Sequence, residues 1–184
     1  DTELTVDGFY DTAASQIDTV LGALMGTSAL WGIFTEGATA CKRGRDFTGI
    51  LTNYSTNVAV ADAVGISSTI SGCSPILDVW VLASGSLESS GSAAGAGVDF
   101  GGSTAGSTYA ILRLLANAGA TPQIAASLQD SANDSTWVTL GEFATASFGN
   151  TLVLLTTGSA ARYRRFKYNI TGSVGIVVSC GSVA

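Results

Sequence analysis

The feature that most constrains this chain is a succession of short apolar segments separated by turn-forming residues. From Ala29 onward the segments are rich in Val, Ile, Leu, Thr and aromatic residues, and Gly, Ser, Asn or Asp interrupt them at short intervals. Such spacing is typical of antiparallel strands, which need only about four to eight residues each. The predicted strands lie at 29–36, 47–60, 65–72, 75–84, 107–116, 121–130, 136–143, 150–157, 162–170 and 174–180, with a further strand at 2–9.

One segment near the start follows a different period. In residues 11–25 apolar residues recur at spacings of three and four, Asp11 is suited to cap the amino-terminal end, and Gly26 is suited to stop the helix. The pattern predicts a short helix at about residues 11–25, on one flank of a sheet. We therefore expect a mainly β fold, an antiparallel β-sandwich or barrel with one flanking α-helix.

The length of 184 residues favours a single domain over 1–184. Within it, residues 85–106 consist largely of Gly, Ser and Ala. Such a segment buries little apolar surface, so we expect a flexible loop at about 85–106.

Charge is scarce in this chain. Charged residues make up 12% of the sequence, against about 25% in an ordinary soluble domain, and hydrophobic residues make up 46%. We infer that partner subunits cover much of the surface; the alternative is a Ser/Thr/Gly-rich surface kept soluble by its hydroxyl groups. The net charge of -6 argues against general binding of nucleic acid.

Several kinds of active site lack their residues in this sequence. It contains no histidine, which excludes Ser-His and Cys-His nucleophile pairs, and it has no phosphate-binding glycine loop. The carboxylate pairs Asp130/Asp134 and Asp7/Asp11 are interpreted as turn and cap residues. We expect no enzyme activity, no metal and no cofactor. The three cysteines are expected to be buried and reduced. No apolar run reaches about 18 residues, so no membrane span is expected.

The cations are concentrated in two places. The stretch RYRRFKYN begins at residue 162, and seven of the eight Lys and Arg residues fall in two short clusters, with Arg113 as the eighth. Alternation along a strand predicts that both faces of the second cluster are mixed. Because Arg binds carboxylates bidentately, we expect pairing with acidic patches, on neighbouring subunits or within the chain. A solvated strand face and direct DNA contact are the alternatives. The interface set is Lys42, Arg43, Arg45, Arg162, Arg164, Arg165 and Lys167, with Glu3, Asp7, Asp11 and Asp18 as candidate partners.

Three stretches, in this order, resemble the tail tube proteins of long-tailed bacteriophages, in particular a group from phages of high-GC hosts. LTVDGFYDTAASQIDTVLGALMG is similar to the strand–GFYD–helix segment of that family. RGRDFTGILTNYSTNVAVADAVGISSTISGC is similar to its central strand pair. SLQDSANDSTWVTLGEF, followed by ARYRRFKYNITG, is similar to its hairpin with a DS loop and Trp and to its RY.R strand.

The resemblance implies a structural virion protein without catalytic activity. Subunits of such tubes form rings, commonly hexameric, which stack into a conduit for genome delivery. The implied partners are other copies of the chain, other tail proteins and double-stranded DNA in transient passage, without sequence-specific binding. The implied location is the virion tail, after assembly in the host bacterial cytoplasm. If the clusters form the interface, charge reversal at Arg164 and Arg165 blocks assembly without unfolding the subunit.

A second interpretation belongs to a different class. The chain could be a virion-surface β-sandwich that binds a receptor or carbohydrate, or that decorates a capsid. The DS-loop hairpin would then carry recognition, with Asp130, Asp134 and Trp137 in the site.

Overall fold

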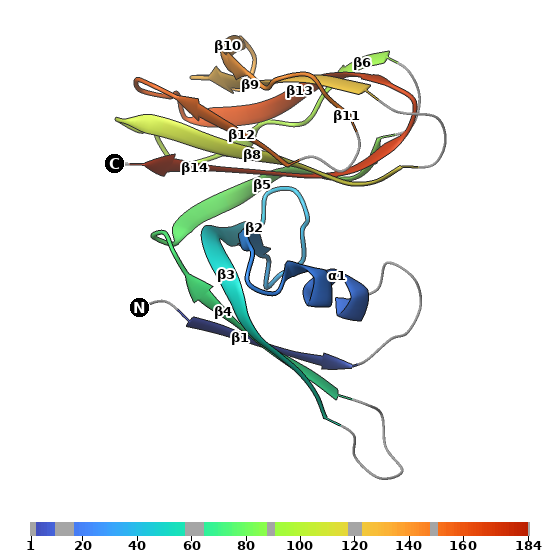
Figure 1. Cartoon of the computed structure of the whole chain (residues 1–184). Helices are drawn as coiled ribbons and strands as arrows, with labels where there is room; N and C mark the ends of the chain where they lie inside the picture. Colours follow the sequence, from blue (N-terminus) through green and yellow to red (C-terminus); the bar gives the residue numbers. More distant parts are fainter. Residues whose placement is uncertain are drawn as a thin grey trace. The chain divides into compact units, whose positions relative to one another are not determined.

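The structure, a computed structural model, describes residues 3–9, 17–57, 65–87, 91–117, 123–147 and 151–183 (Figure 1). The chain divides into two compact units. One comprises Asp1–Gly32 and Asp46–Ile76, and the other comprises Ile33–Arg45 and Leu77–Ala184. A fold of antiparallel strands with one short helix among the described residues confirms the predicted mainly β class.

The first unit is a small antiparallel sheet with the helix. Its strands follow the order β1-β4-β3, and β2 also pairs with β3. Leu21 of the helix is buried, and the residue after the helix, Met25, forms a bridge to Leu51 of β3. The elements are β1 (Glu3–Phe9), α1 (Ile17–Leu24), β2 (Ser28–Ile33), β3 (Arg43–Asn57), whose first residues belong to the second unit, and β4 (Gly65–Gly72).

The second unit contains two packed layers. One layer has the strand order β5-β14-β8-β12; the other has the order β10-β9-β13-β6, with β11 on β9 and β7 on β13 (Figure 1). Its strands are β5 (Leu77–Leu87), β6 (Gly91–Ala94), β7 (Val98–Asp99), β8 (Ser107–Asn117), β9 (Gln123–Ser131), β10 (Val138–Glu142), β11 (Ala146–Ser147), β12 (Thr151–Thr156), β13 (Tyr163–Thr171) and β14 (Val174–Val183).

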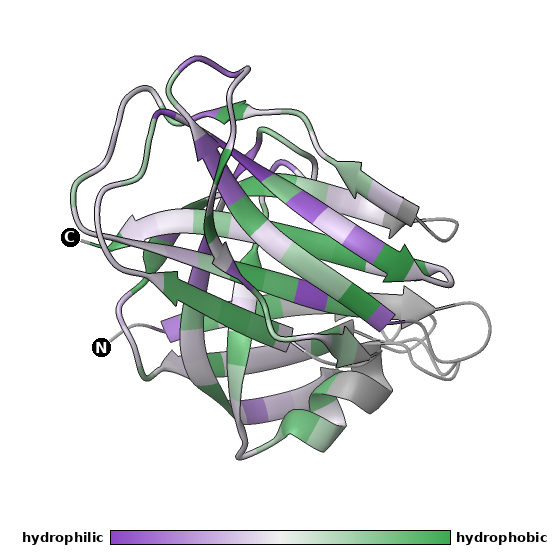
Figure 2. Cartoon of the chain, turned by 90° about the horizontal axis from the view of Figure 1, so that it is seen from above, coloured by the Kyte–Doolittle hydropathy of each residue, from purple (hydrophilic) through white to green (hydrophobic). Residues whose placement is uncertain are grey.

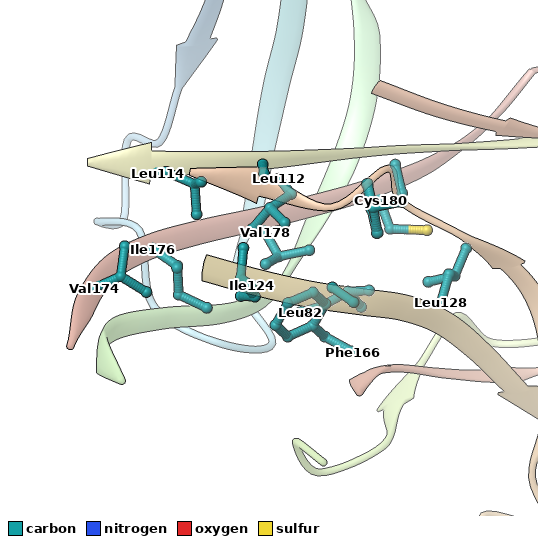
Figure 3. Packing of buried hydrophobic residues seen from close by; sticks show 14 of the residues in the cluster. Leu82, Leu112, Leu114, Ile124, Leu128, Phe166, Val174, Ile176, Val178 and Cys180 are labelled. Atoms are coloured by element: carbon teal, nitrogen blue, oxygen red, sulfur yellow. The ribbon is translucent and has the colours of Figure 1, made fainter. Parts of the chain in front are cut away.

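The core of the second unit lies between these layers. Leu112 and Val178 project from one layer, and Leu128 and Phe166 project from the other (Figure 3). All four are 0% exposed. Burying a large apolar side chain completely stabilises the folded state by about 1.5–3 kcal/mol. Along the strands, hydrophilic and hydrophobic bands alternate (Figure 2). The alternation reflects strand geometry, in which every second side chain points into the sandwich.

The predicted strands and the observed strands correspond closely. The strand predicted at 107–116 is observed as β8. The helix is described only over Ile17–Leu24, so the predicted start at residue 11 lies outside the described residues.

The prediction of a loop over 85–106 is wrong in the parts of that range that form strands. β5 continues to Leu87, and β6 and β7 follow, both pairing with β13. Small side chains carry no strand pattern, but they leave the backbone free to form ladder hydrogen bonds. β6 and β7 are strands because they pair with β13, which lies far along the chain.

Candidate functional site

Arg162 begins the second cationic cluster and pairs within its own chain. Its Nε donates to Asp99 Oδ1 at 2.8 Å, and a second nitrogen reaches Asp99 Oδ2 at 2.5 Å. The backbone N–H of Gly101 donates to the same carboxylate. The guanidinium, followed by this backbone donor, lowers the pKa of Asp99 to about 2. The bidentate geometry expected of Arg is therefore present, but it ties β7 to the start of β13.

This ion pair predicts a specific acid dependence. Because the folded-state pKa of Asp99 lies below its ordinary value near 3.8, the pair stabilises the fold above about pH 4 and loses that effect as pH falls towards 2. The urea midpoint difference between wild type and Asp99→Asn should be small, since the pair is exposed, and should shrink steadily as pH falls from about 4 towards 2. In an Arg162→Gln background the pH dependence should weaken. A difference that stays constant from pH 7 to 2 would contradict the assignment.

Arg164 is placed differently from the sequence prediction. Its side chain is 0% exposed, and its guanidinium lies 4.2 Å from the centre of the Phe100 ring. It donates to the hydroxyls of Thr104 and Ser182. A side chain enclosed in this way cannot contact a neighbouring subunit, so Arg164 is removed from the interface set. The reason is alternation: Arg164 shares the inward face of β13 with Phe166 and Ile170.

The residue opposite Arg164 on the neighbouring strand is acidic. Asp130 of β9 is its direct partner in the antiparallel register, so both side chains leave the sheet on the same face. Asp130 is itself buried, and its Oδ2 accepts a 2.6 Å hydrogen bond from the backbone N–H of Ala161. Arg164 also lies near Cys180, whose thiol pKa is raised to about 11 by burial. The two charges form part of the sandwich interior.

Arg165, on the opposite face, covers an aromatic ring. Its guanidinium lies 4.2 Å from the Trp137 ring centre, and its Nε donates to Gln129 at 2.9 Å. This cation–π contact uses one face of the indole ring. A Cβ added at Gly97 would lie 2.9 Å from the edge of the same ring and also too close to Asp134. Trp137 is therefore packed between Arg165 and the β6–β7 connection.

The structure places the three residues of the alternative recognition site in different surroundings. Asp130 is buried, Asp134 is exposed next to Gly97, and Trp137 is partly covered by Arg165. The loop is organised by Asn133, whose side-chain oxygen accepts hydrogen bonds from the backbone N–H groups of Ser135 and Thr136. The sequence assigned this capping role to the loop acids Asp130 and Asp134, but the residue that caps the turn is Asn133.

The first cluster also pairs locally, inside the second unit. Lys42 Nζ lies 2.8 Å from Glu36 Oε2, and Arg45 Nε lies 3.3 Å from Asp78 Oδ1. Arg43 sits 4.7 Å from the Trp80 ring centre. All the partners in these contacts lie outside the acidic set expected from the sequence. Of that set, Asp11 and the side chains of Asp7 and Asp18 lie outside the described residues.

Lys167 is the exception in RYRRFKYN. Its side chain is exposed on β13, and no ion pair or side-chain hydrogen bond joins it to another described residue. Of the four cations in RYRRFKYN, three therefore contact residues of their own chain, and Lys167 remains available to contact another molecule.

The strand β12 is a feature whose exposure the sequence did not predict. It pairs with β8 on one side and has no partner on the other among the described strands. Val153 is 56% exposed and Leu155 is 61% exposed, opposite Ile111 and Tyr109 of β8. No charged residue occurs from Thr151 to Ala161. The signal in the sequence is LVLL, a strand that is apolar on both faces and lacks a protecting charge.

The prediction that the cysteines are buried is wrong for two of the three. All three are free thiols; Cys180 is buried, whereas Cys41 and Cys73 are exposed.

In the described part of the chain, no cluster of three or more Cys, Asp or Glu residues is arranged to hold a metal ion. No described helix has the length and apolarity needed to cross a membrane.

Comparisons of this chain with protein-family models, curated proteins and solved structures give no match.

Proposed function

We propose that this chain is a structural virion protein that assembles into stacked rings forming a phage tail tube, a conduit for genome delivery. The observation that carries the proposal is the open edge of β12. An edge strand exposes a row of backbone N–H and C=O groups, and soluble monomers usually protect such an edge with charges, proline or a bulge. The described β12 pairs regularly with β8 and has none of these protections.

The occupant we propose for this edge is an edge strand of a second copy. Pairing with it would satisfy the outward backbone groups of β12 and place apolar neighbours beside Val153 and Leu155. A tube requires contacts that repeat without closing on themselves, so β12 would pair with a different edge of its neighbour. The low charge content of the chain supports extensive subunit contact, and its net charge of -6 suits passage of DNA rather than retention.

Of the cationic interface set, the positions still available for subunit contact are the partly exposed ones. Lys42, Arg45 and Arg162 hold acids of their own chain, but surface ion pairs are weak and can exchange partners on assembly. Arg43 and Arg165 lie over tryptophan rings. In the proposed tube these clusters contribute specificity, and the apolar edge contributes most of the association energy.

Negative-stain electron microscopy with light scattering on the same purified sample tests the proposal. We expect hollow tubes or stacked rings, and a mass many times that of one chain. A monodisperse monomer over a wide concentration range would contradict self-assembly.

A charged edge should prevent assembly. The double variant Val153→Lys/Leu155→Lys places two ammonium groups on β12, the kind of charge by which natural edge strands oppose the addition of a further strand. We expect no tubes and a monomeric mass, with a circular dichroism spectrum and urea midpoint close to those of wild type. Each replaced side chain is more than half exposed, so the fold should tolerate the change.

The matched control adds the same charge away from the strand edges. Ala40 and Ala132 are exposed in turns, and Ala40→Lys/Ala132→Lys should assemble as wild type does. Normal tubes from the β12 variant would overturn the role of this edge. Loss of tubes in both variants would assign the defect to net charge.

The alternative, a virion-surface binding or decoration module, is favoured by one different observation. A polar pocket lies on the β10-β9-β13-β6 layer of the second unit, away from the hairpin loop that the sequence pointed to. A small closed oligomer that binds a ligand there would support this class of function.

A further inference from the structure

A pocket of about 280 Å³ is formed by residues of β10, β9, β13 and β6 and of the segment after β10. Its lining includes Ser127, Thr139, Glu142, Thr145, Lys167 and Asn169. This volume is at the lower end of small-molecule sites, roughly 300–1,000 Å³. The pocket therefore holds about one ring with its substituents.

The strand register explains why a hollow exists here. Glu142 of β10 pairs with Ser127 of β9, and Ser127 pairs in turn with Lys167 of β13. The three residues form one row across the sheet, on the face opposite Leu128 and Phe166. A small serine stands between two long side chains, whose backbones are two strand spacings, about 10 Å, apart. Serine leaves a gap that the flanking side chains border.

The two charges in this row do not neutralise one another. Neither Glu142 nor Lys167 forms an ion pair or a side-chain hydrogen bond with another described residue. Asn169, next along the outer face of β13, is likewise exposed. The pocket thus offers an acceptor-only carboxylate, a donor-only ammonium, and amide and hydroxyl groups that do both, with no net charge.

We propose that this pocket binds one neutral sugar ring. A polyhydroxyl ring presents groups that donate and accept around its whole rim, which matches a mixed set of donors and acceptors spaced across three strands. A phosphate or polyanion would face Glu142, and a cation would face Lys167. A zwitterion of amino-acid size would use the two charges and leave the hydroxyls unused. The inference does not rest on the tube proposal, because the pocket does not involve β12, the edge on which that proposal depends; the two share only Lys167.

Saturation-transfer NMR of the purified full chain tests it. The probes are methyl glycosides of glucose, galactose, mannose and N-acetylglucosamine, with glucuronate, phosphate and glycine as charged comparisons. We expect saturation of at least one neutral glycoside at millimolar concentration and weaker or no saturation of the charged probes. A linear oligosaccharide of the same sugar separates two sources: tighter binding than the monomer indicates a polysaccharide chain, and equal binding indicates a free sugar.

Variants locate the binding. Ser127→Phe fills the hollow and should abolish saturation. Lys167→Met and Glu142→Gln each remove a charged hydrogen-bonding group from an exposed side chain and should weaken binding roughly tenfold. Lys42→Met, which removes a cation elsewhere in the same unit, should leave binding unchanged. If Ser127→Phe fails to fold, the two exposed variants decide the question.

Three results would overturn the inference: no neutral glycoside is saturated by wild type, a charged probe binds in preference to all of them, or binding survives in both Lys167→Met and Glu142→Gln. Because tube assembly is scored separately by microscopy, failure here leaves the assembly result unaffected.

Discussion

Replacing Arg164 with Glu is expected to unfold the chain, or to destabilise it by about 3–5 kcal/mol, the usual cost of breaking a buried charge arrangement. Arg164 is 0% exposed, donates to Thr104 and Ser182, and packs on Phe100. A carboxylate there would face Asp130, its direct partner across the ladder, and would leave both hydroxyls without their donor. Since a domain of this kind has only about 5–15 kcal/mol of stability, this loss is a large fraction.

Urea unfolding followed by circular dichroism measures the effect, with Lys167→Glu as the matched control. Both variants reverse a cation on the same strand, but Lys167 is exposed, so its variant should change stability by about 0.5 kcal/mol or less. If Arg164→Glu folded as stably as Lys167→Glu, the burial of Arg164 would be wrong and its place at a subunit interface would be restored. Position on the strand face, not charge alone, decides the outcome.

A side chain at Gly181 is expected to have the second large effect. Gly181 lies in β14 between β5 and β8, and an added Cβ would come within 2.6 Å of the backbone oxygen of Asp78 and 3.2 Å of Val79. A backbone oxygen in the middle of a sheet cannot rotate away, so the strands must separate. We expect Gly181→Val to cost about 3 kcal/mol, at the upper end of overpacking effects.

Gly102→Val is the matched control for this prediction. An added Cβ at Gly102 would meet no atom within 4 Å, and its backbone does not require glycine. The thermal midpoint should fall by many degrees for Gly181→Val and hardly at all for Gly102→Val. Equal midpoints for the two variants would show that β5 and β14 are not packed as closely as described.

Several strands could be predicted from the sequence because their signals are local. β9 largely alternates apolar and polar residues, and turn-forming residues bound both β9 and β13, so the positions of these strands follow from neighbouring letters. β6 and β7 could not be predicted in this way. Their Gly, Ser and Ala residues carry no period, and they are strands because β13, some 70 residues later, supplies hydrogen bonds.

The candidate sites also have features that the sequence predicted and features that only the tertiary structure decided. The concentration of cations at RYRRFKYN was visible in the sequence, as was the mixed character of its two faces. Which face is buried was not visible, because a strand pattern with cations on both sides gives no preference. The packing of β13 against the other layer put Arg164 inside and left Lys167 outside.

The sequence by itself determined the β class, the strand positions and the absence of histidine chemistry, because each depends on residue identity and on periods of a few residues. Only the tertiary structure decided that β12 is an open edge, that Arg164 is enclosed, and that Ser127 stands between Glu142 and Lys167. Those properties depend on which distant strands become neighbours, and strand order is set by the packing of the whole core rather than by any one segment.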